Sequence, residues 1–276
     1  MANYHRPHRL EVELDALAKP HVVLAGGTDF YPARVGRTID EDVLDISGIG
    51  ALRGIAATPQ GWRLGATTTW SELVAADLPP LFDGLKQAAR EVGGRQIQNA
   101  GTLAGNLCNA SPAADGVPPL LALDAEIEIA GPTGSRMVML ADFITGNRRT
   151  VLMPGELVVA IHVPSPAMEA RSAFLKLGAR RYLVISIVMA AATLEIAEGR
   201  IVRARVAVGA CSAVAQRLPA LEAALAGVAL DASLGTQIEA GHLIPLTPID
   251  DVRGSAGYRT DVALVLLRRL LQGFAA

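Results

Sequence analysis

The chain has 276 residues, of which 51% are apolar and 19% charged, and its formal net charge is −2. This length allows one large domain or two modest ones, with enough apolar residues for a sizeable core. The mixed charge argues against a nucleic-acid-binding protein, which would carry a basic face. Two isolated cysteines, Cys108 and Cys211, argue against a metal or iron–sulfur site on this chain and favour a reducing compartment.

The N-terminal sequence lacks the long apolar stretch of a signal peptide. Apolar runs elsewhere fall far short of the about 20 residues that a membrane-spanning helix needs. We therefore expect a cytoplasmic protein without a membrane span.

The first 55 residues predict short elements that alternate in type. Leu10, Leu14 and Leu17 lie at helical spacing. The expected elements are a helix over 10–18, a strand over 21–24, a helix over 30–37 and a strand over 43–46.

A second unit begins near residue 55. Ser71 is the expected N-cap of a helix over 71–76. Residues 94–118 are rich in Gly, Asn, Ser, Pro and Ala, and we expect a long irregular segment there, which in a compact domain is usually functional. The other expected elements are strands over 62–65, 126–130 and 158–163 and helices over 81–93 and 118–124.

Pro164-Ser165-Pro166 marks a boundary, after which the pattern predicts a compact α+β unit. Gly199 is suited to a hairpin turn between two of its strands. The expected elements are strands over 173–177, 185–196 and 201–208, followed by helices over 216–226 and 258–274.

The first segment with chemical potential covers residues 24–30, where a strand leads into Gly26 and Gly27 and then toward a helix. Glycines let a backbone approach a ligand closely, and free N–H groups at a helix start attract phosphate. Thr28 adds a hydroxyl group. The alternative is a plain strand-to-helix turn in which Thr28 or Asp29 caps the helix.

The second segment, residues 96–115, combines small residues with recurring hydroxyl and amide side chains. It suits a large phosphate-bearing ligand, or else it is a structural loop that crosses the core. Familiar alternatives are missing, because the sequence has no GxGxxG, P-loop or GxSxG motif. The histidines are scattered, and Cys108 has no evident partner base nearby in the sequence.

The third segment, residues 174–182, predicts a strand that ends in a basic turn. It is either a solvated charge cluster, or Lys176 or Tyr182 reaches a cofactor held by the first half of the chain.

Taken together, these segments resemble the FAD-binding medium subunit of the xanthine dehydrogenase and carbon monoxide dehydrogenase family of molybdenum hydroxylases. The resemblance covers nearly the whole chain. Its segments are Tyr4-His5-Arg6-Pro7, Ala25-Gly26-Gly27-Thr28-Asp29, Gly65-Ala66-Thr67-Thr68-Thr69, residues 97–115, residues 174–181 and residues 248–259.

This resemblance implies an α+β fold. A two-subdomain FAD-binding domain (PCMH/vanillyl-alcohol-oxidase-like) would cover residues 1–166, with subdomains of about 1–55 and 56–166. A C-terminal domain with a three-stranded antiparallel sheet and helices would cover residues 167–276.

The resemblance also implies a cofactor site on this chain. Residues 25–30 should hold the pyrophosphate of FAD, Val158 or neighbouring Leu157 should lie against the ring system, and Tyr182 would cover a flavin face. The complete set of expected cofactor contacts is Ala25, Gly26, Gly27, Thr28, Asp29, Phe30, Thr102, Gly105, Asn106, Ser111, Asp115, Val158, Lys176 and Tyr182.

Two departures from the family pattern bear on this site. Ala104 stands where the family often has a glycine. Tyr182-Leu183-Val184 replaces a stretch in which xanthine dehydrogenases often have acidic residues, which weakens the expectation that NAD is the electron acceptor.

The function that the resemblance implies is electron transfer in a larger complex. A large subunit would carry the molybdenum cofactor and a small subunit two 2Fe-2S clusters, and electrons would pass through FAD to NAD or another acceptor. We expect no catalytic acid–base residue and no metal on this chain. The alternatives are a self-contained FAD-dependent oxidase or dehydrogenase related to vanillyl-alcohol oxidase, and a non-catalytic assembly protein of the same fold.

Overall fold

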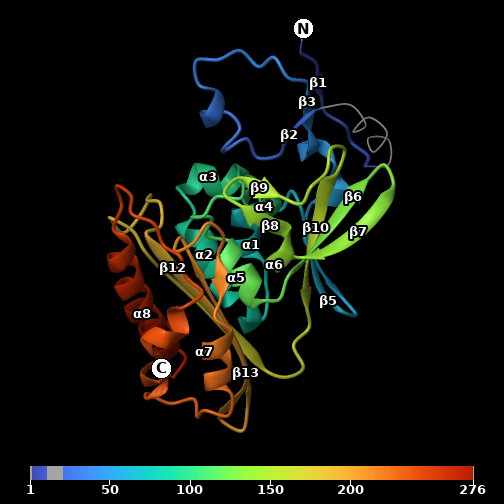
Figure 1. Cartoon of the computed structure of the whole chain (residues 1–276). Coiled ribbons are helices and arrows are strands. Elements are labelled where there is room, and N and C mark those ends of the chain that lie inside the picture. Colours follow the sequence, from blue (N-terminus) through green and yellow to red (C-terminus); the bar gives the residue numbers. More distant parts are fainter. Residues whose placement is uncertain (1, 11–20, 276) are drawn as a thin grey trace.

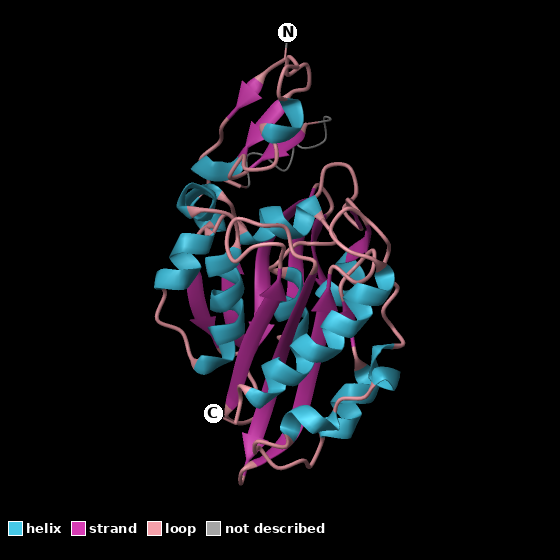
Figure 2. Ribbon diagram, turned by 90° about the vertical axis from the view of Figure 1, so that its left-hand side faces the viewer, coloured by secondary structure: helices cyan, strands magenta, loops and turns pink. Residues whose placement is uncertain are grey.

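The computed structural model describes residues 2–10 and 21–275, so nearly all of the predicted helix over 10–18 lies outside the described residues. A small parallel sheet stands at one end of the molecule (Figures 1 and 2). Its strand order is β1 (Tyr4–His5), β3 (Val43–Asp45), β2 (Val22–Leu24). The predicted helix over 30–37 is wrong in extent: only the 3-10 helix η2 (Pro32–Arg34) forms, and Gly36 follows with φ +75°.

A five-stranded antiparallel sheet forms the second unit, with β10 (Leu157–Pro164) in its middle. Five consecutive residues of β10, from Leu157 to Ile161, are buried, because the sheet is covered on both faces there. The strands in order are β4 (Ile55–Thr58), β5 (Gly61–Gly65), β10, β6 (Glu126–Gly131) and β7 (Gly134–Met139).

Short helices pack around this sheet and fill its core with leucine and alanine side chains. They are α1 (Trp70–Ala75), α2 (Asp83–Glu91), α3 (Arg95–Ala100), α4 (Leu103–Asn109), α5 (Val117–Ala122) and α6 (Leu140–Phe143). A two-stranded ribbon of β8 (Ile144–Gly146) and β9 (Arg149–Thr150) lies beside them. Minor 3-10 helices are η3 (Ile46–Gly48), η4 (Gly50–Leu52) and η5 (Pro80–Phe82).

The C-terminal sheet contains three long antiparallel strands and a two-residue fourth strand, which confirms the predicted α+β fold class. Glu198 and Gly199 turn the central hairpin with φ +51° and +70°, the backbone of a type I′ turn. The elements are β11 (Ala170–Leu177), β12 (Val188–Ala197), β13 (Arg200–Gly209), β14 (Gln216–Arg217), α7 (Pro219–Leu225), η6 (Leu234–Gln237), η7 (Ala240–Leu243) and α8 (Ala256–Gln272).

Even α8, the longest helix described at 17 residues, falls short of the length and apolar character that a bilayer crossing requires.

Two local predictions are wrong. Residues 94–118 are not an irregular segment, because α3, α4 and the start of α5 form within them. The N-cap of α1 is Thr69 rather than Ser71. Thr69 accepts a hydrogen bond from the Glu72 N–H, and the Glu72 carboxylate accepts one from the Thr69 N–H, which is a complete capping box.

The C-terminal sheet lies between helices of both halves of the chain. Helices α2 and α5 pack on one face, while α7 and α8 pack on the other (Figure 2). Helix α2 approaches β11 so closely that a Cβ on Gly84 would lie 3.0 Å from the Ala173 backbone. The buried cluster on the first face draws on both halves and comprises Ala88, Ala122, Phe174, Met189, Ala191 and Ala210.

A buried ion pair reinforces this junction. The Lys176 ammonium lies 2.7 Å from the Asp115 carboxylate, and the two side chains are only 5% and 10% exposed. Lys176 also donates to the carbonyls of Glu91 and Val184, and the Ser186 hydroxyl donates to Asp115 at 2.5 Å. Every charged atom of the pair therefore has a partner, as a buried pair requires.

A second polar network joins α5 to β13 and β14. Asp124, which ends the α5 turn with φ +51°, lies 2.9 Å from Arg203, 3.4 Å from Arg205 and 2.7 Å from Arg217. Glu195 and Glu222 balance the remaining positive charge. The two halves thus share apolar and ionic contacts, and the chain behaves as one body at this junction.

We expect Lys176→Met to lower the free energy of unfolding by about 3–5 kcal/mol, because it leaves the Asp115 carboxylate buried without its cation. Lys86→Met is the control, since among the described residues Lys86 donates only to the Ala76 carbonyl and has no carboxylate within 4.0 Å. Urea denaturation at pH 7 measures both variants. If both variants lost the same free energy of unfolding, the Asp115–Lys176 pair would make no special contribution to stability.

The loss of unfolding free energy caused by Lys176→Met should become smaller as the pH falls. Burial raises the pKa of Asp115 above its ordinary value of 3.8, and the neighbouring Lys176 lowers it again. Without Lys176 the folded-state pKa rises further, so protonation relieves the buried charge at low pH, and the relief is lost as pH rises through that pKa. Urea denaturation of variant and parent at matched pH values between 7 and 5 tests this, and a constant difference would argue against it.

Candidate functional site

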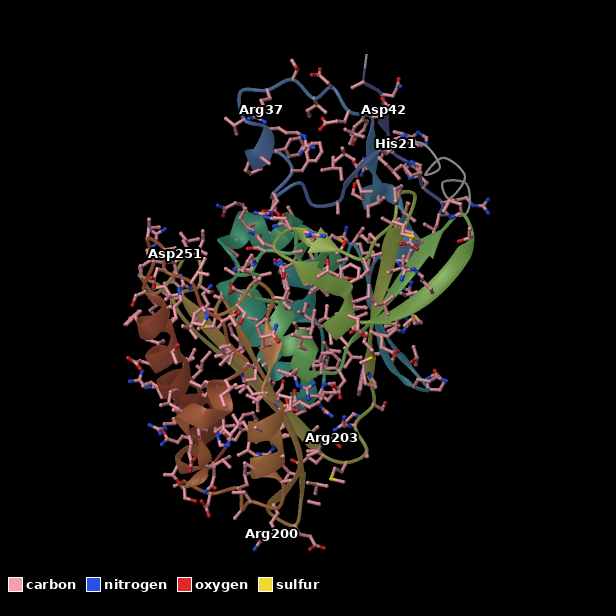
Figure 3. All side chains as sticks on the ribbon, viewed as in Figure 1. His21, Arg37, Asp42, Arg200, Arg203 and Asp251 are labelled. Carbon is pink, nitrogen blue, oxygen red and sulfur yellow. The ribbon has the colours of Figure 1, made fainter. Side chains whose placement is uncertain are left out.

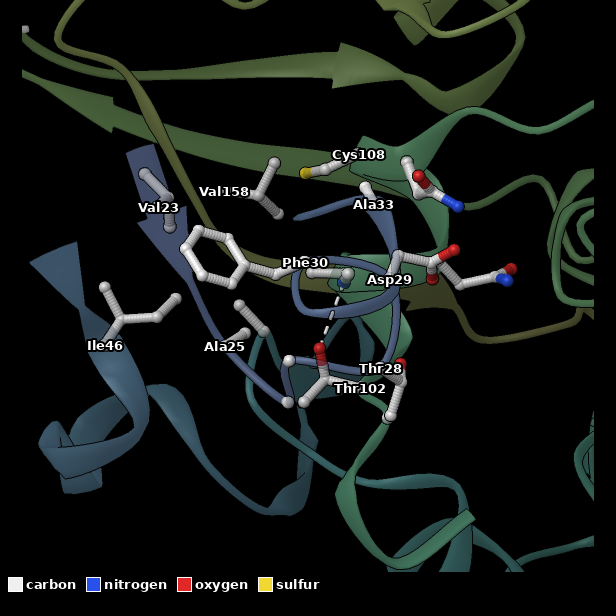
Figure 4. A pocket seen from close by; sticks show the side chains of 18 of the residues that line it. Val23, Ala25, Thr28, Asp29, Phe30, Ala33, Ile46, Thr102, Cys108 and Val158 are labelled. Carbon is white, nitrogen blue, oxygen red and sulfur yellow. Dashed lines mark hydrogen bonds between the residues drawn. The ribbon is translucent and has the colours of Figure 1, made fainter. Parts of the chain in front are cut away.

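A cavity of about 540 Å³ separates the small N-terminal sheet from the helices below it. This volume lies within the roughly 300–1,000 Å³ of small-molecule sites. Its walls come from the loop after β2, from α3 and α4, from the β8–β9 ribbon and from the start of β10. Figure 4 shows the side chains converging from these elements.

The loop after β2 supplies backbone donors to this cavity. Gly27 has φ +72°, a conformation that favours glycine, and it closes a turn in which the Tyr31 N–H bonds the Gly27 carbonyl. Within the described chain, the N–H groups of Gly26, Gly27, Thr28 and Asp29 have no hydrogen-bond acceptor. Successive free N–H groups of this kind form a concave anion site.

Gly26 is required for packing and not only for access by a ligand. A Cβ on Gly26 would lie 1.8 Å from the Ala100 carbonyl oxygen, so the loop rests directly on the backbone between α3 and α4. Gly101, one residue further along, is buried against the same contact. Any side chain at Gly26 would push the loop away from the cavity wall.

The segment around α4 contributes side chains to the cavity wall and few free backbone N–H groups. Leu103 donates to the Thr68 carbonyl at 3.0 Å, and Ala104 donates to the Ala66 carbonyl at 3.4 Å. Gly105 donates to the Thr102 hydroxyl at 3.1 Å, the bond drawn in Figure 4. The first N–H groups of this short helix are therefore used within the protein.

The cavity has an apolar end and a polar end. Ala25, Phe30 and Val158 gather with Val23 and Ile46 on one side of Figure 4, while Thr28 and Asp29 lie on the other. A ligand that fits both ends combines a flat apolar group with an anionic group, because the loop after β2 offers free backbone N–H groups to an anion.

Charged side chains at the cavity are largely paired. Arg34 lies 4.0 Å over the Phe30 ring and 3.3 Å from Glu41. Arg148 donates to Asn109. Bidentate hydrogen bonds from Arg136 hold the pKa of Glu156 below its usual range, so this carboxylate stays ionised and is a poor proton donor.

The structure brings most of the expected cofactor contacts together around this cavity. Those that line it are Ala25, Gly26, Gly27, Thr28, Asp29, Phe30, Thr102, Gly105, Asn106 and Val158, together with Leu157. The Asn106 side-chain oxygen accepts from the Gly116 N–H at 3.3 Å, which leaves its amide nitrogen available to a ligand.

Four expected contacts lie outside the cavity lining. Ser111 accepts from the Ala113 N–H, and Asp115 and Lys176 bind each other. Tyr182 is 58% exposed, with the Arg181 guanidinium 5.1 Å from its ring centre. Contact of these four with a cofactor stays a prediction.

Sequence reasoning missed several lining residues, among them Arg34, Arg148 and Glu156. The arginine pair after Gly146-Asn147 was the available signal for Arg148, a basic turn between two short strands. Arg34 and Glu156 lie in segments without any motif. Among the described residues no group of three or more His, Cys, Asp or Glu side chains is arranged to hold a metal ion.

Two protein-family models match the chain. Residues 1–166 match the FAD binding domain in molybdopterin dehydrogenase, and residues 173–274 match the CO dehydrogenase flavoprotein C-terminal domain.

Among curated proteins, the chain is similar to the putative xanthine dehydrogenase FAD-binding subunit of Escherichia coli K12. The two are 30% identical over 98% of this chain and 94% of the relative. The carbon monoxide dehydrogenase medium chain of Afipia carboxidovorans is 32% identical over 98% of this chain and 95% of that protein.

Solved structures give the same result. Reconstituted CO dehydrogenase from Oligotropha carboxidovorans matches with a TM-score of 0.88 and 29% identity over 100% of this chain and 97% of that one. Quinoline 2-oxidoreductase from Pseudomonas putida 86 matches with a TM-score of 0.88 and 27% identity over 100% and 97%.

We expect Gly26→Ala to lower the melting temperature by several degrees, because its Cβ would overlap the Ala100 carbonyl and force the loop outward. The control is Gly50→Ala, since a Cβ there meets no atom within 4 Å and its φ is ordinary. Thermal unfolding followed by circular dichroism compares them. A variant as stable as the control would show that the loop does not depend on this contact.

Proposed function

The chain belongs to the family of FAD-binding subunits of the molybdenum hydroxylases, and on that premise we propose that it holds FAD in the cavity and relays electrons inside a larger complex. The observation that carries the proposal is the cavity itself. It combines an apolar end with a row of free backbone N–H groups at residues 26–29.

The residues present fit FAD as a ligand. Free N–H groups beside Gly27, with the Thr28 hydroxyl, suit a diphosphate, because oriented amides stabilise anions without a charged side chain. Phe30 and Val158 offer flat apolar contact for an aromatic ring. FAD would supply the redox chemistry when bound, and the chain would fix its position and exclude water.

The cavity favours a relay over a self-contained oxidase. Glu156 is a carboxylate at the cavity wall, and Arg136 holds it ionised, so it is not available as a general acid. This argues for substrate chemistry on another polypeptide. We therefore favour an electron relay over a self-contained oxidase and over a non-catalytic assembly protein.

Exposed apolar side chains support work inside a complex. Leu183, Ile185, Ile249 and Val252 are each more than half exposed, on two loops that Arg253 joins. Arg253 donates to the Ser186 carbonyl and pairs with the Asp251 carboxylate, which is labelled in Figure 3. Concentrated apolar surface of this kind marks contact with other proteins.

We propose an iron–sulfur small subunit as electron donor and a large subunit that carries the molybdenum cofactor. NAD or another acceptor would take the electrons from FAD, and the cytoplasm is the proposed location. The relatives carry the names of xanthine, carbon monoxide and quinoline enzymes at similar identity. This spread supports a substrate pocket on a partner, outside this chain.

We also propose that residues 1–166 form the FAD-binding domain, with subdomains of about 1–55 and 56–166, and that residues 167–276 form the C-terminal domain. The separate sheets of each part support this division.

Gly105→Leu should abolish retention of FAD. Gly105 lines the cavity, and a Cβ there meets only the Thr102 hydroxyl within 4 Å, at 2.7 Å, so a longer side chain would extend into the ligand's space. The flavin-to-protein ratio of the purified chain, read from visible absorbance, measures the effect.

The control for this variant is Gly257→Leu, because Gly257 also lies in the first turn of a helix and meets no atom within 4 Å. It should keep the parent's flavin content and melting temperature. A full flavin complement in folded Gly105→Leu would place FAD elsewhere.

The FAD-loaded chain alone should not oxidise purines, aldehydes or N-heterocycles, whereas co-expression with its partner subunits should restore turnover. The reason is that the proposed relay leaves the oxidation of the substrate to the subunit that carries the molybdenum cofactor. Steady-state assays of the isolated chain and of the assembled complex compare the two. Turnover by the chain alone would favour the self-contained oxidase.

A further inference from the structure

A second cavity, of about 650 Å³, lies on the opposite side of the segment that ends α2. Glu91 lines this cavity, whereas the next residue, Val92, lines the first one. Its walls are the end of α2, the strand β11, the basic turn at residues 178–181 and the end of α8. The two cavities share no lining residue, so this is a separate site.

Arginines dominate the charge of the second cavity. Arg90 comes from α2, Arg180 and Arg181 from the turn, and Arg269 from α8. Glu91 is the single carboxylate among its lining residues, and the charge of Lys176 is already matched by Asp115. Four guanidinium groups therefore face one carboxylate in a protein whose net charge is −2.

Three of these four arginines make no hydrogen bond or ion pair with the described part of the protein through their side chains. In the described part of the chain, Arg90, Arg181 and Arg269 have no carboxylate within 4.0 Å, and none donates a side-chain hydrogen bond to the protein. Arg180 donates two hydrogen bonds to the Leu183 carbonyl, and these bonds fix the turn. All four arginines are exposed to solvent, and they reach this one cavity from three elements, so a bound anion is the natural counterpart of their charge.

We propose that this cavity binds the diphosphate group of a nucleotide, of the nucleoside diphosphate class. Guanidinium groups bind phosphate oxygens in bidentate fashion, and their spread over three elements exceeds the reach of a single phosphate. Leu175, Leu177 and Leu270 give the same cavity an apolar surface for a base. The site goes beyond the proposed function, because it uses none of the residues that line the FAD cavity.

The test is calorimetric titration of ADP into the full chain saturated with FAD, so that the first cavity is filled. ADP should bind, and inorganic pyrophosphate should compete more weakly because it lacks the base. AMP should bind about tenfold more weakly than ADP, since one phosphate is lost. Flavin absorbance followed in parallel should show no release of FAD.

The decisive variant is Arg90→Gln/Arg269→Gln, which should weaken ADP binding about 100-fold, about tenfold for each arginine. Its charge-matched control is Arg171→Gln/Arg200→Gln, at exposed arginines outside the cavity. The control should bind ADP as the parent does, and all proteins should keep their melting temperature and flavin content.

Three results would overturn the proposal. The first is no binding of ADP to the FAD-saturated chain. The second is an equally weakened binding of ADP to the decisive variant and to the control, which would mean that ADP is attracted unspecifically to positive charge. The third is binding of pyrophosphate as tight as that of ADP, which would show that the cavity does not recognise the nucleoside.

Discussion

The contact between Gly26 and the Ala100 carbonyl is the constraint on which the proposed flavin site depends. It seats the loop after β2 on the junction of α3 and α4, so that two segments more than 70 residues apart in sequence form one wall. Because the α4 donors are consumed by Thr68, Ala66 and Thr102, the free N–H groups of that loop are left for the ligand. The proposed binding of phosphate therefore depends on the position in which this contact holds the backbone of the loop.

The C-terminal sheet fixes the other side of this arrangement. Asp115 follows the α4 segment and is held by Lys176 and Ser186 from beyond the proposed domain boundary. The alanine-rich faces of α2 and α5 pack on the same sheet. The helices around the cavity are thus anchored from behind by a buried charge pair as well as by apolar contact.

The sequence allowed the fold class to be predicted, and the family resemblance placed ten of the fourteen expected cofactor contacts in the cavity lining. Helices α3 and α4 escaped prediction, since six or seven residues complete too few turns to show a helical period. The pairing of Lys176 with Asp115, 61 residues apart, leaves no local trace. Likewise, nothing in the sequence separates a glycine needed for packing, Gly26, from one that needs a positive φ, Gly27.

The shared sheet has a consequence for biosynthesis. Ala88 on α2 and Ala122 on α5 are buried in one cluster with Phe174, Met189 and Ala191, which lie on strands that follow residue 166. A ribosome at ordinary elongation rates needs several seconds more to deliver those strands. During that interval the apolar faces of these two helices lack their covering strands, so assembly of the cavity beside them waits for the C-terminal half of the chain.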